Sequence, residues 1–77
     1  DYLKSLVIIP LNANQWAALL SFSYNLGPGN ADNLMGNLNR GDYMALGAQW
    51  KQYVYAGGKV NQDLVERRQR EWELFVS

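Results

Sequence analysis

The sequence predicts a single all-α domain of about five helices around one central buried helix. Apolar residues make up 48% of the 77-residue chain and recur at helical spacing along most of it. Three good N-cap residues, Asn12, Asp42 and Asn61, each precede one of these runs. We expect one domain at most, because a chain of this length buries only about 60% of the surface that its unfolded form exposes.

The first helix is predicted over residues 2–9, where Leu3, Leu6 and Val7 form an apolar face. Pro10 ends it, because proline disfavours helical geometry in the residue before it. No capping residue precedes this helix, so the start of the chain looks cut.

The central helix is predicted over residues 13–26. Asn12 and Gln15 have the spacing of a capping box. The helix is apolar on nearly every side, which is typical of a helix surrounded by others. Gly27 is expected in the left-handed conformation at its end, and Pro28 prevents its continuation.

A short helix capped by Asn30 or Asp32 and ended by Gly41 comes next, and Asp42 caps a helix over residues 43–53.

Gly57 and Gly58 break the chain before Asn61 caps the final helix. Two ion pairs at i,i+4 spacing are expected on this helix, Glu66 with Arg70 and Arg67 with Glu71. Trp16, Trp50 and Trp72 lie on apolar stripes and are predicted to pack in the core.

Composition excludes several kinds of site. Seven Lys and Arg balance seven Asp and Glu, so no net charge favours nucleic acid or an anionic membrane. The chain has no Cys and no His, which removes thiolate and imidazole ligands. We predict no metal, no cofactor and no membrane insertion; the one long apolar run is too short to cross a bilayer.

Four segments in the same order resemble phage-type lysozymes (endolysins) of glycoside hydrolase family 24. They are LNANQWAALLSFSYNLGPG (11–29), LNRGDY (38–43), YVYAGGKV (53–60) and LVERRQRE (64–71). The resemblance covers almost the whole chain and implies the C-terminal helical lobe of such an enzyme, a lysozyme-like all-α lobe.

The resemblance also implies an activity. These lysozymes hydrolyse the β-1,4 link between N-acetylmuramic acid and N-acetylglucosamine in peptidoglycan, and they act at the bacterial cell wall. Their catalytic Glu, with an assisting Asp and Thr, lies in the N-terminal lobe in a Glu-x8-Asp-x5-Thr pattern that has no match here. We therefore predict no catalytic residue in this chain, and an inactive chain when it is isolated from that lobe.

The chain's own carboxylates suit other roles. Asp32 and Asp42 lie where helix caps belong. Glu66, Glu71 and Glu73 lie among arginines, and we expect solvated ion pairs instead of a general acid.

The predicted contribution is one wall of a saccharide cleft. Asn25, at the end of the central helix, offers a donor and an acceptor for a sugar hydroxyl or acetamido group; alternatively it satisfies backbone groups at the helix end. Tyr55, beside Gly57 and Gly58, offers an aromatic surface next to exposed backbone N–H groups, although Tyr55 also suits the core.

The resemblance further implies that an arginine at the start of the last helix pairs across the cleft with the catalytic Glu. The apolar stripe turns Arg68 inward, which favours Arg67 for this role. The alternative is an exposed Arg67 paired with Glu71.

Three functional interpretations remain open. The chain is a lysozyme lobe whose partners are the glycan strand and an N-terminal lobe or a chain replacing it. Alternatively, it is a peptidoglycan-binding module without activity. The third is a structural helical protein that assembles through the face left exposed.

Overall fold

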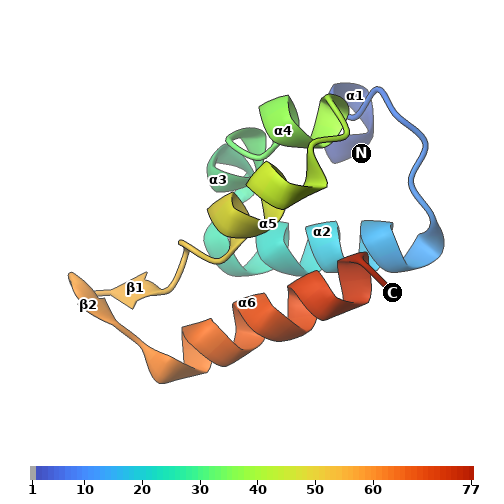
Figure 1. Ribbon diagram of the computed structural model, residues 1–77. Coiled ribbons are helices and arrows are strands. Elements are labelled where there is room, and N and C mark those ends of the chain that lie inside the picture. Colours follow the sequence, from blue (N-terminus) through green and yellow to red (C-terminus); the bar gives the residue numbers. More distant parts are fainter. Residues whose placement is uncertain (1) are drawn as a thin grey trace.

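The computed structural model describes residues 2–77, and Figure 1 shows their arrangement. The helices are α1 (Tyr2–Leu6), α2 (Ala13–Leu26), α3 (Pro28–Asp32), α4 (Met35–Asn39), α5 (Tyr43–Trp50) and α6 (Gln62–Phe75), with strands β1 (Tyr55–Ala56) and β2 (Lys59–Val60) before α6. The two long helices, α2 and α6, run side by side in opposite directions (Figure 1). α3 packs against α2, α1 contacts α3, and α5 contacts both α4 and α6. The all-α prediction is confirmed.

The predicted capping residues begin the three longest helices. The Asn12 side chain accepts from the Gln15 N–H at 2.8 Å, and the Gln15 side chain accepts from the Asn12 N–H at 2.9 Å, so the capping box is complete. Asp42 and Asn61 accept in the same way from backbone N–H groups at the start of α5 and α6. These local hydrogen bonds explain why the sequence locates the helix starts well.

The helix ends differ more from the prediction. α1 stops at Leu6 instead of residue 9, because the Asn39 side chain accepts from the Ile8 N–H and donates to the Leu6 carbonyl. Gly27 has a positive φ of 90°, but its ψ of 156° differs from that of the left-handed helical conformation expected at this position. Pro28 begins α3, a position where its missing N–H is not needed.

Two further elements were not expected. A single short helix was predicted between residues 30 and 41, and the structure has α3 and α4 there. The predicted break at Gly57 and Gly58 is the two-residue turn of a hairpin, in which Tyr55 pairs with Val60. The φ angles of 60° and 81° at these glycines suit the tight turn that a right-twisted hairpin prefers.

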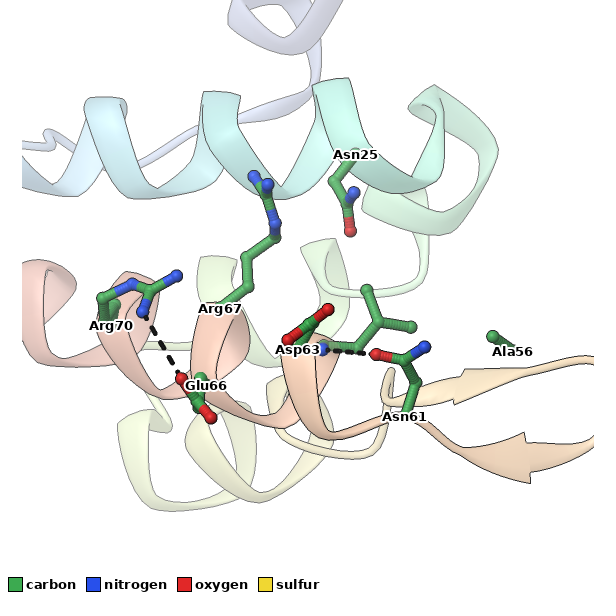
Figure 2. Close-up of a pocket in the computed structure, with 8 residues that line it drawn as sticks. Asn25, Ala56, Asn61, Asp63, Glu66, Arg67 and Arg70 are labelled. Carbon is green, nitrogen blue, oxygen red and sulfur yellow. Dashed lines mark hydrogen bonds and ion pairs between the residues drawn. The ribbon is translucent and has the colours of Figure 1, made fainter.

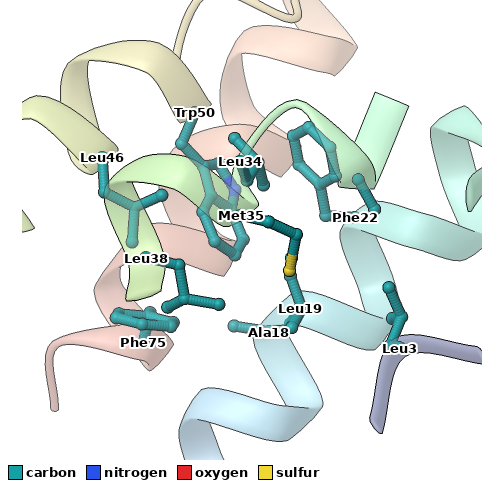
Figure 3. Packing of buried hydrophobic residues seen from close by; sticks show 11 residues of the cluster. Leu3, Ala18, Leu19, Phe22, Leu34, Met35, Leu38, Leu46, Trp50 and Phe75 are labelled. Atoms are coloured by element: carbon teal, nitrogen blue, oxygen red, sulfur yellow. The ribbon is translucent and has the colours of Figure 1, made fainter. Parts of the chain in front are cut away.

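The core lies between α2, α6 and the shorter helices, and all six described helices contribute buried side chains to it (Figure 3). Trp50 is fully buried, and its ring meets Phe22 edge to face with the centroids 5.1 Å apart. Trp72 stacks on Phe75 at 5.1 Å and contacts Trp50. Gly47 allows α5 to approach the Trp72 ring, since a Cβ there would lie 2.7 Å from it. Trp50 therefore joins α5 to α2, and Trp72 joins α6 to α5, in agreement with the predicted packing of both in the core.

The central helix is less enclosed than its composition predicts. Ala18, Leu19 and Phe22 are fully buried, whereas Tyr24 near the end of α2 is 89% exposed. This end of α2 faces a concavity. None of the described helices has both the length and the apolar character needed to span a membrane.

Candidate functional site

A concavity of about 500 Å³ lies between the end of α2, the hairpin and the first turns of α6 (Figure 2). Its lining residues are Asn25, Ala56, Asn61, Asp63, Leu64, Glu66, Arg67 and Arg70. A smaller concavity of about 230 Å³ lies further along α6, beside Ser21 and Leu74. Arg67 and Arg70 line both concavities, which follow one another along the seam of α2 and α6, and we call the two together the groove.

Asn25 projects from the end of α2 toward α6 (Figure 2). Its side-chain oxygen accepts a hydrogen bond of 2.8 Å from Nη2 of Arg68. The residue is exposed and lines the concavity, and no other residue that the structure describes bonds to its amide nitrogen. Arg68 thus occupies one of the two acceptor positions of this oxygen, and both N–H donors of the amide remain at the concavity.

Arg68 and Glu71 form a buried ion pair beneath this wall. Arg68 is fully buried and Glu71 is 5% exposed. Nη2 of Arg68 donates to Oε2 of Glu71 at 3.0 Å, and Nε lies 2.8 Å from Oε1. The predictions that Glu71 is solvated and pairs with Arg67 are therefore wrong. The i,i+3 spacing puts both residues on the inward stripe of α6, whereas Arg67 is one residue out of phase with it.

Glu71 has partners on three helices. The Ser21 hydroxyl of α2 donates to Oε2 at 2.5 Å, and Nε1 of Trp50 of α5 donates to Oε1 at 3.2 Å. The guanidinium of Arg68 also lies over the Phe22 ring, 5.1 Å from its centroid. A carboxylate with this many donors ties α2, α5 and α6 together at one point.

The positive charge of Arg68 is compensated inside the core by the carboxylate of Glu71. Burial lowers the pKa of Arg68, the proximity of Arg67 lowers it further, and Glu71 opposes both effects. The guanidinium stays charged, because arginine does not lose its proton in proteins. Within the described part of the chain, Nη1 of Arg68 is buried with no hydrogen-bond acceptor, and the N–H on Nε is not directed at Glu71. Removal of Glu71 would thus leave a buried cation without compensation.

Arg67 is exposed, and its guanidinium extends from α6 toward α2 across the groove (Figure 2). Among the described residues, its side chain has no hydrogen bond or ion pair. Its neighbour Arg70 forms the predicted pair with Glu66, at 3.9 Å. Arg67 is thus the cation in the groove that is free to meet a ligand.

The hairpin contributes less to the concavity than predicted. Tyr55 is 63% exposed, which contradicts its alternative assignment to the core. Gly57 and Gly58 are also exposed, but Ala56 is the hairpin residue that lines the concavity. The sequence analysis predicted that Asn61 begins the last helix, but it did not predict that the first turn of this helix lines the concavity.

The carboxylates of the groove do not form an acid and base pair. Glu71 accepts hydrogen bonds from three donors, Glu66 pairs with Arg70, and Asp63 is exposed in the first turn of α6. Among the described residues, no cluster of three or more His, Cys, Asp or Glu side chains could hold a metal ion. The groove can donate hydrogen bonds to a ligand, but it has no evident proton donor for bond cleavage.

Comparisons of the sequence with known proteins find relatives of one kind. Residues 1–71 match the family model described as phage lysozyme. The whole chain is 37% identical to part of an endolysin of Bacillus phage PZA, covering 31% of that protein, and 37% identical to part of an endolysin of Salmonella phage P22, covering 53% of it. About three quarters of the chain, 77%, is 41% identical to a SAR-endolysin of Bacteriophage PS119, covering 36% of it. The chain therefore spans from about a third to about half of the length of these relatives.

Proposed function

The chain belongs to the phage lysozyme family, and we propose that it forms one wall of the cleft in which a peptidoglycan-degrading endolysin holds its glycan strand. The resemblance carried by its four sequence segments is thereby confirmed at the level of the family. The proposed reaction is hydrolysis of the β-1,4 link between N-acetylmuramic acid and N-acetylglucosamine, at the bacterial cell wall.

One observation carries this proposal. The groove between α2 and α6 offers polar donors from both sides, Asn25 from α2 and Arg67 from α6, while the carboxylates around it are paired or exposed. Glycoside hydrolysis needs a carboxylic acid to protonate the leaving oxygen and a second polar group to hold water or stabilise the cation. A groove with binding groups and no such acid suits a substrate wall.

We assign the catalytic acid to an N-terminal lobe that completes the cleft. In this assignment Arg67 faces the acid across the cleft and Asn25 contacts the sugar. Tyr55, Gly57 and Gly58 form an exposed aromatic and backbone edge at the hairpin, where a longer glycan would extend beyond the concavity.

Complementation of activity tests the proposal. The N-terminal part of the Salmonella phage P22 endolysin, the portion that this chain does not match, is added to the chain in a peptidoglycan suspension whose turbidity is followed. We expect clearing by the mixture and none by either part alone. The matched control is the same N-terminal part with its catalytic Glu changed to Gln, which should not clear.

The other outcomes distinguish the alternatives. Clearing by the chain alone would refute the assignment of the acid to another lobe. Capture of the chain by purified sacculi without clearing of the mixture would favour a binding module. Self-association with neither clearing nor capture would favour a structural protein.

A further inference from the structure

The orientation of the Asn25 side chain is fixed by chemistry. Its contact with Arg68 is a hydrogen bond of 2.8 Å to a guanidinium nitrogen. A guanidinium can only donate, so the atom of Asn25 that faces it must be the carbonyl oxygen. The amide nitrogen is left with two N–H donors at the groove, where no described residue accepts from it.

Arg68 cannot turn away from Asn25, because it is itself held in place. It is fully buried, and one nitrogen, Nη2, donates both to Asn25 and to Glu71. Glu71 is held in turn by Ser21 and Trp50. The position of the Asn25 amide is therefore set by contacts with α2, α5 and α6 that lie beneath the groove.

The opposite side of the groove carries both a donor, Arg67, and the exposed carboxylate of Asp63, which line the same concavity. Arg67 extends from α6 toward α2, and its guanidinium also only donates (Figure 2). The nearby carboxylate of Glu66 is engaged by Arg70, and Asp63 lies one turn earlier on α6. A ligand group lying between Asn25 and Arg67 thus meets donors from both sides.

From this geometry we propose that Arg68 and Glu71 are positioning residues that hold the Asn25 amide with its N–H donors toward the groove. The groove thereby selects a ligand with a hydrogen-bond acceptor, the carbonyl oxygen of an N-acetylated amino sugar. A de-N-acetylated amino sugar has an ammonium group in its place. That group has no lone pair and cannot accept a hydrogen bond from the Asn25 amide. This proposal rests on the proposed function as a saccharide wall and adds that the wall distinguishes N-acetylated from de-N-acetylated amino sugars.

Two soluble probes test the selection. The ¹⁵N-labelled chain is titrated with tri-N-acetylchitotriose and with the glucosamine trimer, and the NMR signals of the Asn25 side-chain amide are followed. We expect the acetylated trimer to shift these signals and to bind at least about tenfold more tightly, the effect of one hydrogen bond. Equal binding of the two trimers would refute the selection and leave the saccharide wall intact. Binding of neither would overturn both proposals.

Three variants test the positioning. Asn25→Asp keeps an oxygen for Arg68 but replaces the N–H donors by a second oxygen, and it should weaken binding of the acetylated trimer about tenfold. Arg68→Lys keeps the charge but loses the planar fork, so Asn25 should be released and affinity should fall about fivefold. Asn12→Ala removes the cap at the other end of α2, away from Asn25, and serves as the control for reduced stability.

The comparison is made where nuclear magnetic resonance shows all variants to be folded. A purely structural role for Arg68 predicts that Arg68→Lys, like Asn12→Ala, keeps the affinity of the unmodified chain. That result would overturn the positioning role. Loss of affinity in Arg68→Lys but not in Asn12→Ala would support it.

Discussion

The buried pair of Arg68 and Glu71 gives the sharpest test of how this structure is stabilised. Replacement of Glu71 by Leu keeps a side chain of similar size but removes the carboxylate that compensates Arg68. Because Arg68 is fully buried, water cannot readily replace the lost partner. Within the described residues, Nη1 of Arg68 already has no acceptor. We expect a large loss of stability from this single change.

The magnitude follows from the contacts. Removing one partner of a buried ion pair costs about 3–5 kcal/mol. The Trp50 N–H would also lose its acceptor, which adds about 1 kcal/mol. A chain of 77 residues has a free energy of unfolding of about 4–12 kcal/mol. Glu71→Leu should thus remove a third or more of the total and could leave the chain unfolded in water.

The double variant Arg68→Met with Glu71→Leu separates two explanations. An apolar pair of similar volume often replaces a buried ion pair at little or no cost. Met would lie against the Phe22 ring where the arginine stem now lies. We expect the double variant to be within about 1–2 kcal/mol of the unmodified chain, the remaining loss coming from the Trp50 N–H.

Equilibrium unfolding in urea, followed by tryptophan fluorescence and far-UV circular dichroism, measures these differences. With a slope of about 1 kcal/mol per molar urea, a loss of about 4–6 kcal/mol should lower the midpoint for Glu71→Leu by about 4–6 M. The reasoning is refuted if Glu71→Leu unfolds at the same urea concentration as the unmodified chain. It is equally refuted if the double variant is as unstable as the single one.

Three further changes have smaller expected effects on the same urea transition. Gly47→Ala places a Cβ 2.7 Å from the Trp72 ring. The overpacking should cost about 1–3 kcal/mol, which outweighs the roughly 1 kcal/mol gained in helix propensity. A more stable variant would show that the ring can move. Asn12→Ala removes the capping box of α2 and should cost about 1 kcal/mol, so an unchanged midpoint would contradict the role of the cap. Glu66→Gln breaks the exposed pair with Arg70 and should change stability by less than about 0.5 kcal/mol; a larger loss would mean that the pair is not solvated.

Sequence reasoning located the parts of this fold that depend on neighbouring residues. Asn12 and Asn61 cap helices through bonds to residues three positions ahead, and such bonds can be read from spacing. The hairpin was missed because β1 and β2 have two residues each, too few to show alternation. The adjacent glycines were the available signal, since their positive φ angles are what a two-residue hairpin turn requires.

The candidate site was harder to predict because its key contacts join distant residues. The spacing of Arg68 predicted that it turns inward, but Glu71 was assigned to the surface as an i,i+4 partner of Arg67. Its true partners include Ser21, 50 residues away, and Trp50, 21 residues away. Spacing along one helix cannot show which side chains from other helices will meet a carboxylate.

The same buried pair connects stability with the proposed recognition of sugar. If an apolar pair can replace Arg68 and Glu71 at little cost, then stability alone does not explain why two charges lie inside so small a core. What an apolar pair cannot supply is the hydrogen bond that fixes the Asn25 amide. The double variant should therefore fold nearly as well as the unmodified chain yet bind tri-N-acetylchitotriose about tenfold more weakly. A double variant that folds and binds normally would show that the ion pair does not position Asn25.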